Sequence, residues 1–455
     1  MSRLLLTFYG DDFTGSTDAL EQLMLAGIRT VLFIEPPTPA QLRTFPGLQA
    51  VGVAGMTRSM TSAAVEKELR PALRKLKALG APHVHYKVCS TFDSSPTVGS
   101  IGRVMEVAAK IFPAPFIPIL AAAPALGRYT IFGTHFARYG IGSAGEIHRL
   151  DLHPSISKHP VTPMTEADLR LHLSKQTRKK IALFDILKLA LPKNEARTAL
   201  KKILTEKPDA VLFDALNTGH LKQIGGLIYA YASRRKPLFS IGSSGVEAAL
   251  AAHFNLRRSG QAEAQAKKGN SQSLPTSAAT NVLIGSGSCS PVTAGQIAWA
   301  LKHGFSEVTL NAAKLAVSKS AMPEIKRAVD AAAQMLQAGR SVIVHTARRG
   351  ADKHIAAKLK NNTAQVLGAA LGMVLRGVLE RRRVRRICVA GGDTSSFAAR
   401  ALGIEALEMM APLTPGAPLC RAHAPGSPVD GCEMIFKGGQ VGAENYFGIV
   451  KRGRL

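Results

Sequence analysis

The chain has 455 residues, of which 46% are hydrophobic and 5% aromatic, and this length predicts two or three domains. No apolar run reaches the roughly 18 residues that a membrane helix needs, so we expect no membrane partner. The five cysteines are scattered and form no CxxC pair, which predicts reduced thiols and a cytoplasmic location.

The net charge of +27 favours anionic ligands, among them nucleotides, acid sugars and nucleic acid. The run RRRVRR at 381–386 is the strongest indication of nucleic-acid binding. It leads directly into an apolar strand, however, and no aromatic residues that could stack on bases accompany it. We therefore interpret the run as the solvated end of a helix and expect no nucleic-acid partner.

The opening stretch LLLTFYGDDFTGSTDAL predicts a buried parallel strand at Leu4–Phe8 and a helix whose pattern opens at Asp18. Asp11 and Asp12 stand at the carboxyl end of that strand, where open α/β sheets bind ligands. Such a pair can accept a proton from a substrate hydroxyl or hold a divalent cation. Of the two, Asp12 is the preferred base. The alternative is that both residues only cap the helix.

Three further strands are predicted at Thr30–Ile34, Gln49–Ala54 and His83–Val88, with a helix at Ser62–Leu79 before the last of them. Arg58 follows the second of these strands. The end of the third and the loop after it are dense in hydroxyl groups beside a lysine and an aspartate, which suits a polyhydroxylated, anionic small molecule: Lys87, Ser90, Thr91, Asp93, Ser94 and Ser95. The alternative is a turn that makes ordinary side-chain to backbone bonds.

The segment 113–160 is rich in loop residues. Its acidic and histidine residues could suggest a metal, but their spacing matches no strong ligand pattern, so the metal ligands stay unknown: His148, Asp151, His153 and His159. Thr165 and Asp168 then predict a helix start.

Alternating strands and helices continue to the end of the chain. The strands are predicted at 180–184, 210–213, 237–241, 281–284, 341–345 and 386–390, and the helices at 323–336, 363–379 and 397–402. Residues 257–280 are polar and read as an interdomain linker. We therefore expect domains at 1–256 and 281–455, each an α/β fold with a mostly parallel sheet and helices on both faces.

Four turns share the plan strand, small polar residues, helix, and they lie at Asp11, Gly242, Gly285 and Gly391. Backbone N–H groups at such a helix start form an anion site. No GxxxxGK[ST] loop occurs, and GSGSCS lacks the third glycine of the dinucleotide fingerprint. Together the turns point to phosphate chemistry, with a nicotinamide-dependent oxidoreductase or a basic nucleic-acid binder as alternatives.

Five segments together resemble the four-carbon acid sugar kinase family: YGDDFTGSTDAL, YKVCSTFDSSP, HPVTPMTEADL, GSGSCSPVTAGQ and AGGDTSSFAARALG. The resemblance runs in order from about Leu4 to Gly442, and the STFDSS form is similar to that of the 3-oxo-tetronate kinases. Asp393 stands where the family usually shows Glu, and 134–150 looks unlike the commonest members.

The resemblance implies ATP-dependent phosphorylation of a hydroxyl, with 3-oxo-tetronate as acceptor and threonate, erythronate or 3-oxo-isoapionate as alternatives. It implies that the first domain holds the acid sugar through Asp12, Arg58, Lys87 and the loop 90–94. ATP would bind in the second domain, with Mg²⁺ bridging phosphate oxygens. The residues implied for ATP are Ser288, Gly391, Gly392, Asp393, Thr394, Ser395, Gly438 and Gly439. A homo-oligomer is compatible with the sequence.

Overall fold

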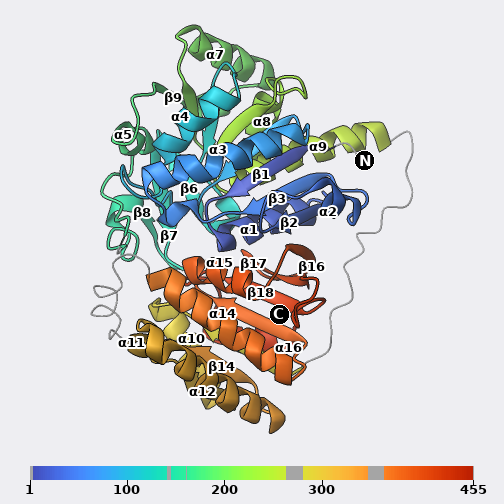
Figure 1. Cartoon of the computed structure of the whole chain (residues 1–455). Coiled ribbons are helices and arrows are strands. Elements are labelled where there is room, and N and C mark those ends of the chain that lie inside the picture. The colour runs from blue at the N-terminus through green and yellow to red at the C-terminus, as the bar shows by residue number, and fades with distance from the viewer. Residues whose placement is uncertain (1–3, 141–144, 160, 263–279, 347–362, 454–455) are drawn as a thin grey trace. The chain divides into compact units, whose positions relative to one another are not determined.

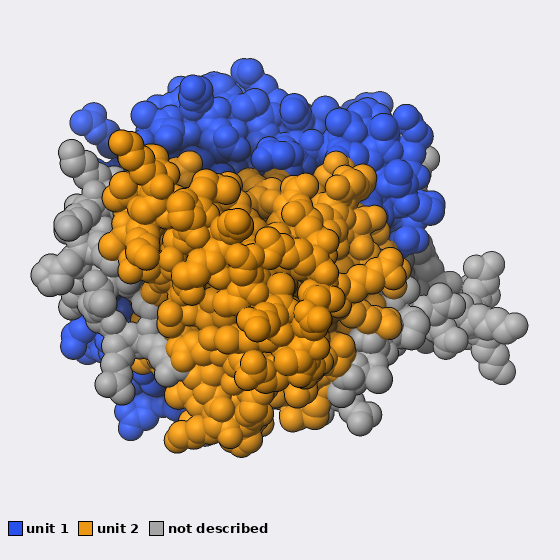
Figure 2. Space-filling model, turned by 60° about the horizontal axis from the view of Figure 1, so that its bottom comes forward, with its two compact units in different colours: residues 1–31, 35–139, 143–272 blue, residues 32–34, 140–142, 273–455 orange. Residues whose placement is uncertain are grey.

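The computed structural model describes residues 4–140, 145–159, 161–262, 280–346 and 363–453 (Figure 1). The chain divides into two units (Figure 2). The first comprises 1–31, 35–139 and 143–272, and the second comprises 32–34, 140–142 and 273–455. Within the segment expected to be a linker, helix α9 (Gly245–Ala262) continues to Ala262, and 263–279 lie outside the described residues.

The first unit is organised around a sheet in the order β2-β3-β1-β4-β11-β5-β10-β9. Pairing is parallel from β3 through β1, β4 and β11 to β5, and again from β5 through β10 to β9. The strands are β1 (Leu6–Gly10), β2 (Thr30–Phe33), β3 (Ala50–Ala54), β4 (His83–Lys87), β5 (Ile117–Leu120), β9 (Ile181–Phe184), β10 (Ala210–Phe213) and β11 (Leu238–Gly242).

The register aligns the carboxyl ends of the central strands. Gly10 of β1 lies opposite Ala54 of β3 and Lys87 of β4, and Lys87 in turn lies opposite Gly242 of β11. The loops that follow these four strands therefore leave the sheet at one edge. This edge carries Asp11, the short 3₁₀ helix with Arg58, and the loop after Lys87.

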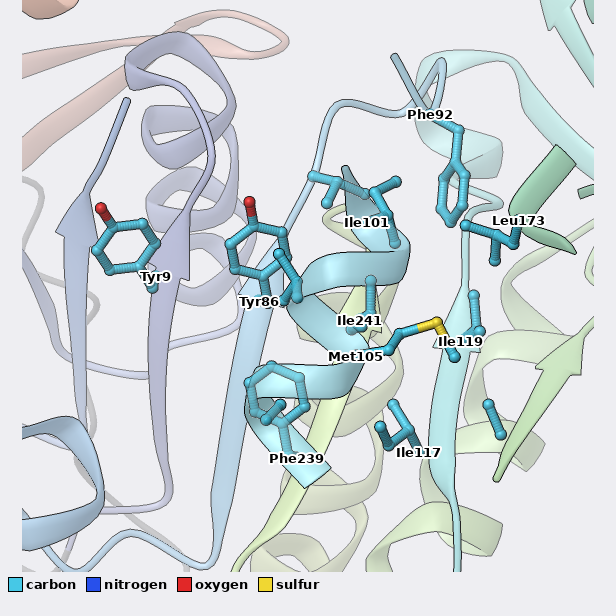
Figure 3. Packing of buried hydrophobic residues seen from close by; sticks show 14 of the residues in the cluster. Tyr9, Tyr86, Phe92, Ile101, Met105, Ile117, Ile119, Leu173, Phe239 and Ile241 are labelled. Carbon is cyan, nitrogen blue, oxygen red and sulfur yellow. The ribbon is translucent and has the colours of Figure 1, made fainter. Parts of the chain in front are cut away.

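Helices cover both faces of this sheet, as the alternating pattern predicted. α3 and α4 pack on the face to which Tyr9, Tyr86 and Ile241 point (Figure 3), while α9 contacts both α1 and α8 on the opposite face. The helices of this unit are α1 (Phe13–Leu25), α2 (Pro39–Arg43), α3 (Ser62–Ala78), α4 (Ile101–Ile111), α5 (Leu169–Ser174), α6 (Ile186–Leu189), α7 (Lys193–Thr205), α8 (Thr218–Tyr229) and α9.

A separate antiparallel sheet of three strands corrects the expectation of a loop-rich segment at 113–160. Its strands β6 (Arg128–Ile131), β7 (Thr134–Arg138) and β8 (Ile147–Arg149) pair in that order. Hydrophobic periodicity could not indicate this sheet, because most residues buried on β6 and β7 are polar: Arg128, Thr130 and His135, beside Ala137. The predicted helix start at Thr165 is also wrong, since Asp168 is the N-cap of α5.

The second unit contains a sheet in the order β13-β14-β12-β15-β18-β17-β16. Its first five strands pair in parallel, and β17 and β16 extend it antiparallel at one side. The strands are β12 (Val282–Ser286), β13 (Ser306–Thr309), β14 (Val342–His345), β15 (Arg386–Ala390), β16 (Ala406–Thr414), β17 (Ala417–His423) and β18 (Glu433–Lys437). The predicted fold class, α/β with mostly parallel sheets, is confirmed.

In this unit α14 contacts both α12 and α15, while α10 contacts α16. The helices are α10 (Pro291–Lys302), α11 (Ala312–Leu315), α12 (Ser318–Gln337), α14 (Thr363–Arg381), α15 (Gly392–Ala401) and α16 (Tyr446–Arg452). Two predicted starts are wrong. α12 begins before Pro323, and α15 begins at Gly392 rather than Phe397, so the GGDTSS turn forms the first turn of a helix.

Candidate active site

Asp12 is the N-cap of α1, which therefore begins at Phe13 and not at Asp18. Its Oδ1 accepts a hydrogen bond from the N–H of Gly15 at 2.9 Å, and Oδ2 accepts one from the hydroxyl of Thr14 at 2.8 Å. Nη1 of Arg58 lies 3.0 Å from the same Oδ2. Asp12 therefore caps α1, and its Oδ2 also pairs with Arg58, so the cap is not its only contact. Burial acts to raise the pKa of Asp12, but Arg58, Lys87 and these hydrogen bonds outweigh it and lower that pKa.

Asp11 has the opposite electrostatic character. Its carboxyl is 3% exposed, and no described residue donates a hydrogen bond to its buried Oδ1. Burial, followed by the charge of Asp12, raises the pKa of Asp11 well above its ordinary value. Asp11 therefore has a higher proton affinity than the adjacent Asp12. Enzymes with paired carboxyls use such a difference to give one carboxyl the proton-transfer role and to keep the other ionised. Asp11 is the one suited to exchange a proton.

Lys87 faces the interior rather than the open edge. Its Nζ lies 3.5 Å from Oδ2 of Asp18 and donates to the carbonyl of Val88 at 3.0 Å. Burial acts to lower the pKa of Lys87, but Asp18 and Asp12 outweigh it and raise that pKa. The sequence pattern predicts only a helix at Asp18. Its position on α1 facing Lys87 places a third buried carboxyl behind Asp11 and Asp12.

A fourth buried acid, Glu247, lies on α9. Burial raises the pKa of Glu247 to about 8, and burial lowers the pKa of His85 to about 3. Oε1 of Glu247 lies 3.6 Å from Nε2 of His85. Both side chains are therefore uncharged at neutral pH, and the contact is one of neutral groups rather than an ion pair.

We expect Glu247→Gln to stabilise the protein at pH 8. The pKa of Glu247 is higher in the folded state than in the unfolded chain, where it has its ordinary value of 4.5. Between these two values the folded protein keeps a proton that the unfolded chain has released. The free energy of unfolding therefore falls as pH rises from about 4.5 to about 8, and glutamine removes this loss. The difference in melting temperature between Glu247→Gln and wild type, taken at pH 5 and at pH 8, measures this effect. An equal change in melting temperature at both values would contradict the assignment.

The loop after β4 is held by contacts of two kinds. Its own side chains form one set, in which Thr91 donates to Oδ1 of Asp93 at 2.9 Å. The neighbouring elements form the other: Ser94 Oγ lies 2.8 Å from Nε2 of His172, and the carbonyl of Ser90 lies 2.9 Å from Nε2 of His135. The charge of Asp93 acts on Asp11, which places this loop near the carboxyl pair, while the hydroxyl of Ser94 is directed to His172.

Phe92 lies in the middle of this loop in a left-handed conformation, with φ 58°, and its ring is buried in the α3/α4 face of the core (Figure 3). Such a conformation costs a residue with a side chain about 1–3 kcal/mol. Burial of the ring offsets this cost and fixes the loop. This anchor could not be predicted, because a single phenylalanine between polar residues has no periodic signal.

In the second unit the structure brings the predicted phosphate turns together. Ser286 of β12 lies opposite Ala390 of β15, and Ala390 lies opposite Lys437 of β18, so these strands also end in register. A Cβ on Gly439 would stand 2.9 Å from the hydroxyl of Ser288. Ser288, the Gly391–Ser395 turn and Gly438–Gly439 therefore occupy one edge of the sheet.

The first turn of α15 offers the backbone geometry of an anion site. Gly391, its N-cap, has φ +133°, a conformation that residues with a Cβ rarely adopt, and it provides no side-chain cap. The first N–H groups of a helix have no partner within it and can bind an anion. Ser395 donates both N–H and hydroxyl to the carbonyl of Gly391, which makes it part of the turn's framework.

Lys437 is a buried cation at this edge that the sequence analysis missed. Its Nζ donates to Oγ1 of Thr293 at 2.9 Å, and burial lowers the pKa of Lys437 to about 8. A lysine that ends a buried strand directly before two glycines is the signal that could have identified it. An ammonium here suits a phosphate, because it supplies positive charge beside the two glycine turns.

Neither unit shows a protein-built metal cage: the described residues contain no group of three or more histidine, cysteine, aspartate or glutamate side chains that could hold a metal. His148 and His153 contact each other through their rings, with centroids 5.6 Å apart. In the described part of the chain, no helix is long and apolar enough to cross a membrane.

Comparisons with known proteins assign each unit a class of ligand. Residues 6–250 match the model of a sugar-binding N-terminal domain, and 283–447 match that of a nucleotide-binding C-terminal domain. The chain is 43% identical to a 3-oxo-isoapionate kinase of Paraburkholderia graminis, covering 99% of this chain and 95% of that protein. It is 31% identical to a 3-oxo-tetronate kinase of Pseudomonas savastanoi pv. phaseolicola, covering 98% and 96% respectively.

The fold has a counterpart among solved structures as well. A crystal structure from Salmonella typhimurium LT2 superposes with a TM-score of 0.77 at 25% identity, over 99% of both chains. Two matching domain models in the expected order, together with relatives above 30% identity along almost the whole length, establish the relationship. The chain belongs to the four-carbon acid sugar kinase family.

Proposed function

We propose that this kinase transfers the γ-phosphoryl group of ATP to a hydroxyl of a four-carbon acid sugar, converting 3-oxo-tetronate to 3-oxo-tetronate 4-phosphate. The observation that carries the proposal is the division of the polar groups. The paired carboxyls Asp11 and Asp12 lie in the unit that matches a sugar-binding domain, and the glycine turns lie in the unit that matches a nucleotide-binding domain.

In this proposal Asp11 receives the proton of the acceptor hydroxyl as the new O–P bond forms and the bond to ADP breaks. Asp12 stays ionised and, with Arg58, orients the sugar. Thr91 and Asp93 supply further hydrogen bonds from the loop after β4, beside Ser90 and Lys87. Ser94 acts through His172 to hold that loop in place.

For the nucleotide, the backbone of Gly391–Thr394 and Gly438–Gly439 binds phosphate oxygens, with Ser288 and Lys437 beside them. Mg²⁺ is normally held by one or two carboxylates together with substrate phosphates rather than by a cage of protein ligands. Asp393 is the carboxylate of this turn, so the donor set fits that ion. When bound, Mg²⁺ neutralises charge on the phosphates.

A substrate panel tests the proposal. ATP-dependent phosphorylation is measured for 3-oxo-tetronate, threonate, erythronate and 3-oxo-isoapionate by a coupled ADP assay. We expect turnover of 3-oxo-tetronate; the 43% identity to a 3-oxo-isoapionate kinase makes that branched acid the second candidate acceptor. Absence of turnover with every acid, by protein that binds ATP, would overturn the proposed function.

A further inference from the structure

The β6–β7 hairpin brings a buried polar face to the substrate loop. Thr130 Oγ1 lies 2.9 Å from Nδ1 of His135, whose Nε2 lies 2.9 Å from the carbonyl of Ser90. Arg128 is two residues before Thr130 on the same strand, so both side chains leave the same face. The hairpin therefore directs a guanidinium toward the elements that surround the loop after β4.

The guanidinium of Arg128 is buried but only partly satisfied. The side chain is 4% exposed, and Nη1 makes its hydrogen bonds, to the carbonyls of Leu126 at 3.1 Å, Gly127 at 3.4 Å and Arg138 at 2.9 Å. Its buried Nε has no hydrogen-bond partner among the described residues. The hydrogen bonds of Nη1 therefore fix one side of the guanidinium. The other side, formed by Nε and Nη2, remains available to another acceptor.

Acidic groups of the site act on this guanidinium from a distance. Burial lowers the pKa of Arg128, and the carboxyls of Asp93 and Asp18 act in the opposite direction. In the described part of the chain, however, no carboxylate comes within ion-pairing distance of Arg128. A buried cation without a counter-ion is unfavourable unless a ligand supplies the charge.

The other cations near the carboxyl pair already face acids. Arg58 lies against Asp12, and Lys87 lies against Asp18. Because these charges are compensated within the protein, neither is a free counter-ion for a substrate carboxylate. The Nε–Nη2 edge of an arginine is a planar pair of donors that matches the two oxygens of a carboxylate.

We propose that Arg128 binds the carboxylate of the acid-sugar substrate and so determines the preference for acids over neutral sugars. The inference rests on the proposed function, because it assigns one more group to the same substrate. It also accounts for the polar interior of the hairpin: Thr130 and His135 fix the strand against Ser90, and Arg128 then points at the ligand. The acid is recognised by charge, whereas its hydroxyls are recognised at Asp11 and Thr91.

The test compares an acid with a neutral analogue of the same length. Wild type, Arg128→Gln and Arg128→Lys are assayed with 3-oxo-tetronate and with erythrulose, the ketose in which a hydroxymethyl group replaces the carboxylate. Arg149→Gln is the matched control, since Arg149 belongs to the same small sheet and pairs with Asp151 at its surface. Circular dichroism and melting temperature check that each variant is folded.

We expect Arg128→Gln to lower kcat/KM for the acid by ~10- to 50-fold, the effect of losing a charge-assisted hydrogen bond. Its kcat/KM for erythrulose and its KM for ATP stay within about 2-fold of wild type. Arg128→Lys retains the charge, and we expect its kcat/KM for the acid to lie between those of wild type and Arg128→Gln. An equal loss with both sugars would show a structural role and overturn the inference, as would an unchanged kcat/KM for the acid.

Binding of erythronate without ATP, measured by isothermal titration calorimetry, separates this inference from the proposed function. Wild type that binds erythronate but phosphorylates no acid would overturn the proposed function, and weaker binding by Arg128→Gln would still support the carboxylate contact. If wild type phosphorylates an acid and Arg128→Gln binds erythronate equally well, the inference fails and the proposed function stands. If neither wild type nor Arg128→Gln binds erythronate, the proposed contact between Arg128 and the substrate carboxylate is overturned.

Discussion

We expect Asp11→Asn to lower kcat by at least ~100-fold, the lower range of general-base effects. The carboxyl of Asp11 is buried beside Asp12, its Oδ1 has no partner among the described residues, and its pKa is raised by burial. Such a group is a stronger base, once ionised, than an ordinary carboxylate. Asparagine at this position preserves the shape of the Asp11 side chain but cannot accept the proton. The measurement is kcat as a function of pH, which should rise through the pKa of Asp11 in wild type only.

Asp12→Asn is the matched control, because it makes the same chemical change one residue away. Asparagine is as good an N-cap as aspartate, so the bond from Gly15 and the start of α1 should survive. The ion pair with Arg58 is lost, and we expect the variant to raise KM for the acid sugar more than it lowers kcat. A larger fall in kcat for Asp12→Asn than for Asp11→Asn would make Asp12 the base, as the sequence alone suggested.

The same Asp11→Asn variant should gain stability at neutral pH. Since the pKa of Asp11 is raised in the folded state, the unfolded chain releases its proton first, at about 3.8, and the free energy of unfolding falls as pH rises above that value. Asparagine does not titrate, so the free energy of unfolding of the variant lacks this fall with pH. Thermal melting should therefore place the variant above wild type at pH 7, with the difference shrinking toward pH 4.

The sequence predicted those parts of the site that follow from strand order and chain order. The strands that end in Gly10 and Lys87 are short and contain aromatic and β-branched residues, so the placement of Asp11 and of the loop after Lys87 at one edge could be expected. The helix start could not, because Phe13–Thr17 lacks the apolar spacing that a helix prediction needs, and the cap at Asp12 determines it instead.

Residues that act through burial were harder to predict. Arg128 and Glu247 are charged residue types, and nothing in their local sequence distinguishes a buried charged side chain from a surface one. For Lys437 the only local signal is its place at the end of a strand before two glycines. Their positions depend on tertiary contacts, such as the bond from Lys437 to Thr293 across 144 residues. The antiparallel strands β16 and β17 were missed for a related reason, since the pairing of β17 with both β16 and β18 depends on tertiary contacts and not on composition.

We expect Gly439→Ala to weaken ATP binding by up to ~100-fold, the upper range for losing a charge-assisted hydrogen bond. The added Cβ would stand 2.9 Å from both the hydroxyl of Ser288 and the Cβ of Ser290, closer than side chains tolerate. The turn must therefore move away from the start of α10, and the phosphate donors on Gly438 and Ser288 move apart with it. Calorimetric titration with ATP measures the affinity, and melting temperature reports on the fold.

Gly295→Ala is the control, because it places the same methyl group on α10, where nothing lies within 4 Å of the new Cβ. Alanine favours a helix over glycine by roughly 0.5–1 kcal/mol, so this variant should melt slightly higher and bind ATP as wild type does. Acid-sugar binding, which is assigned to the other unit, should change in neither variant. If Gly439→Ala is folded and binds ATP with wild-type affinity, the Gly438–Gly439 turn does not contact the nucleotide, and the phosphate site reduces to the start of α15 and Lys437.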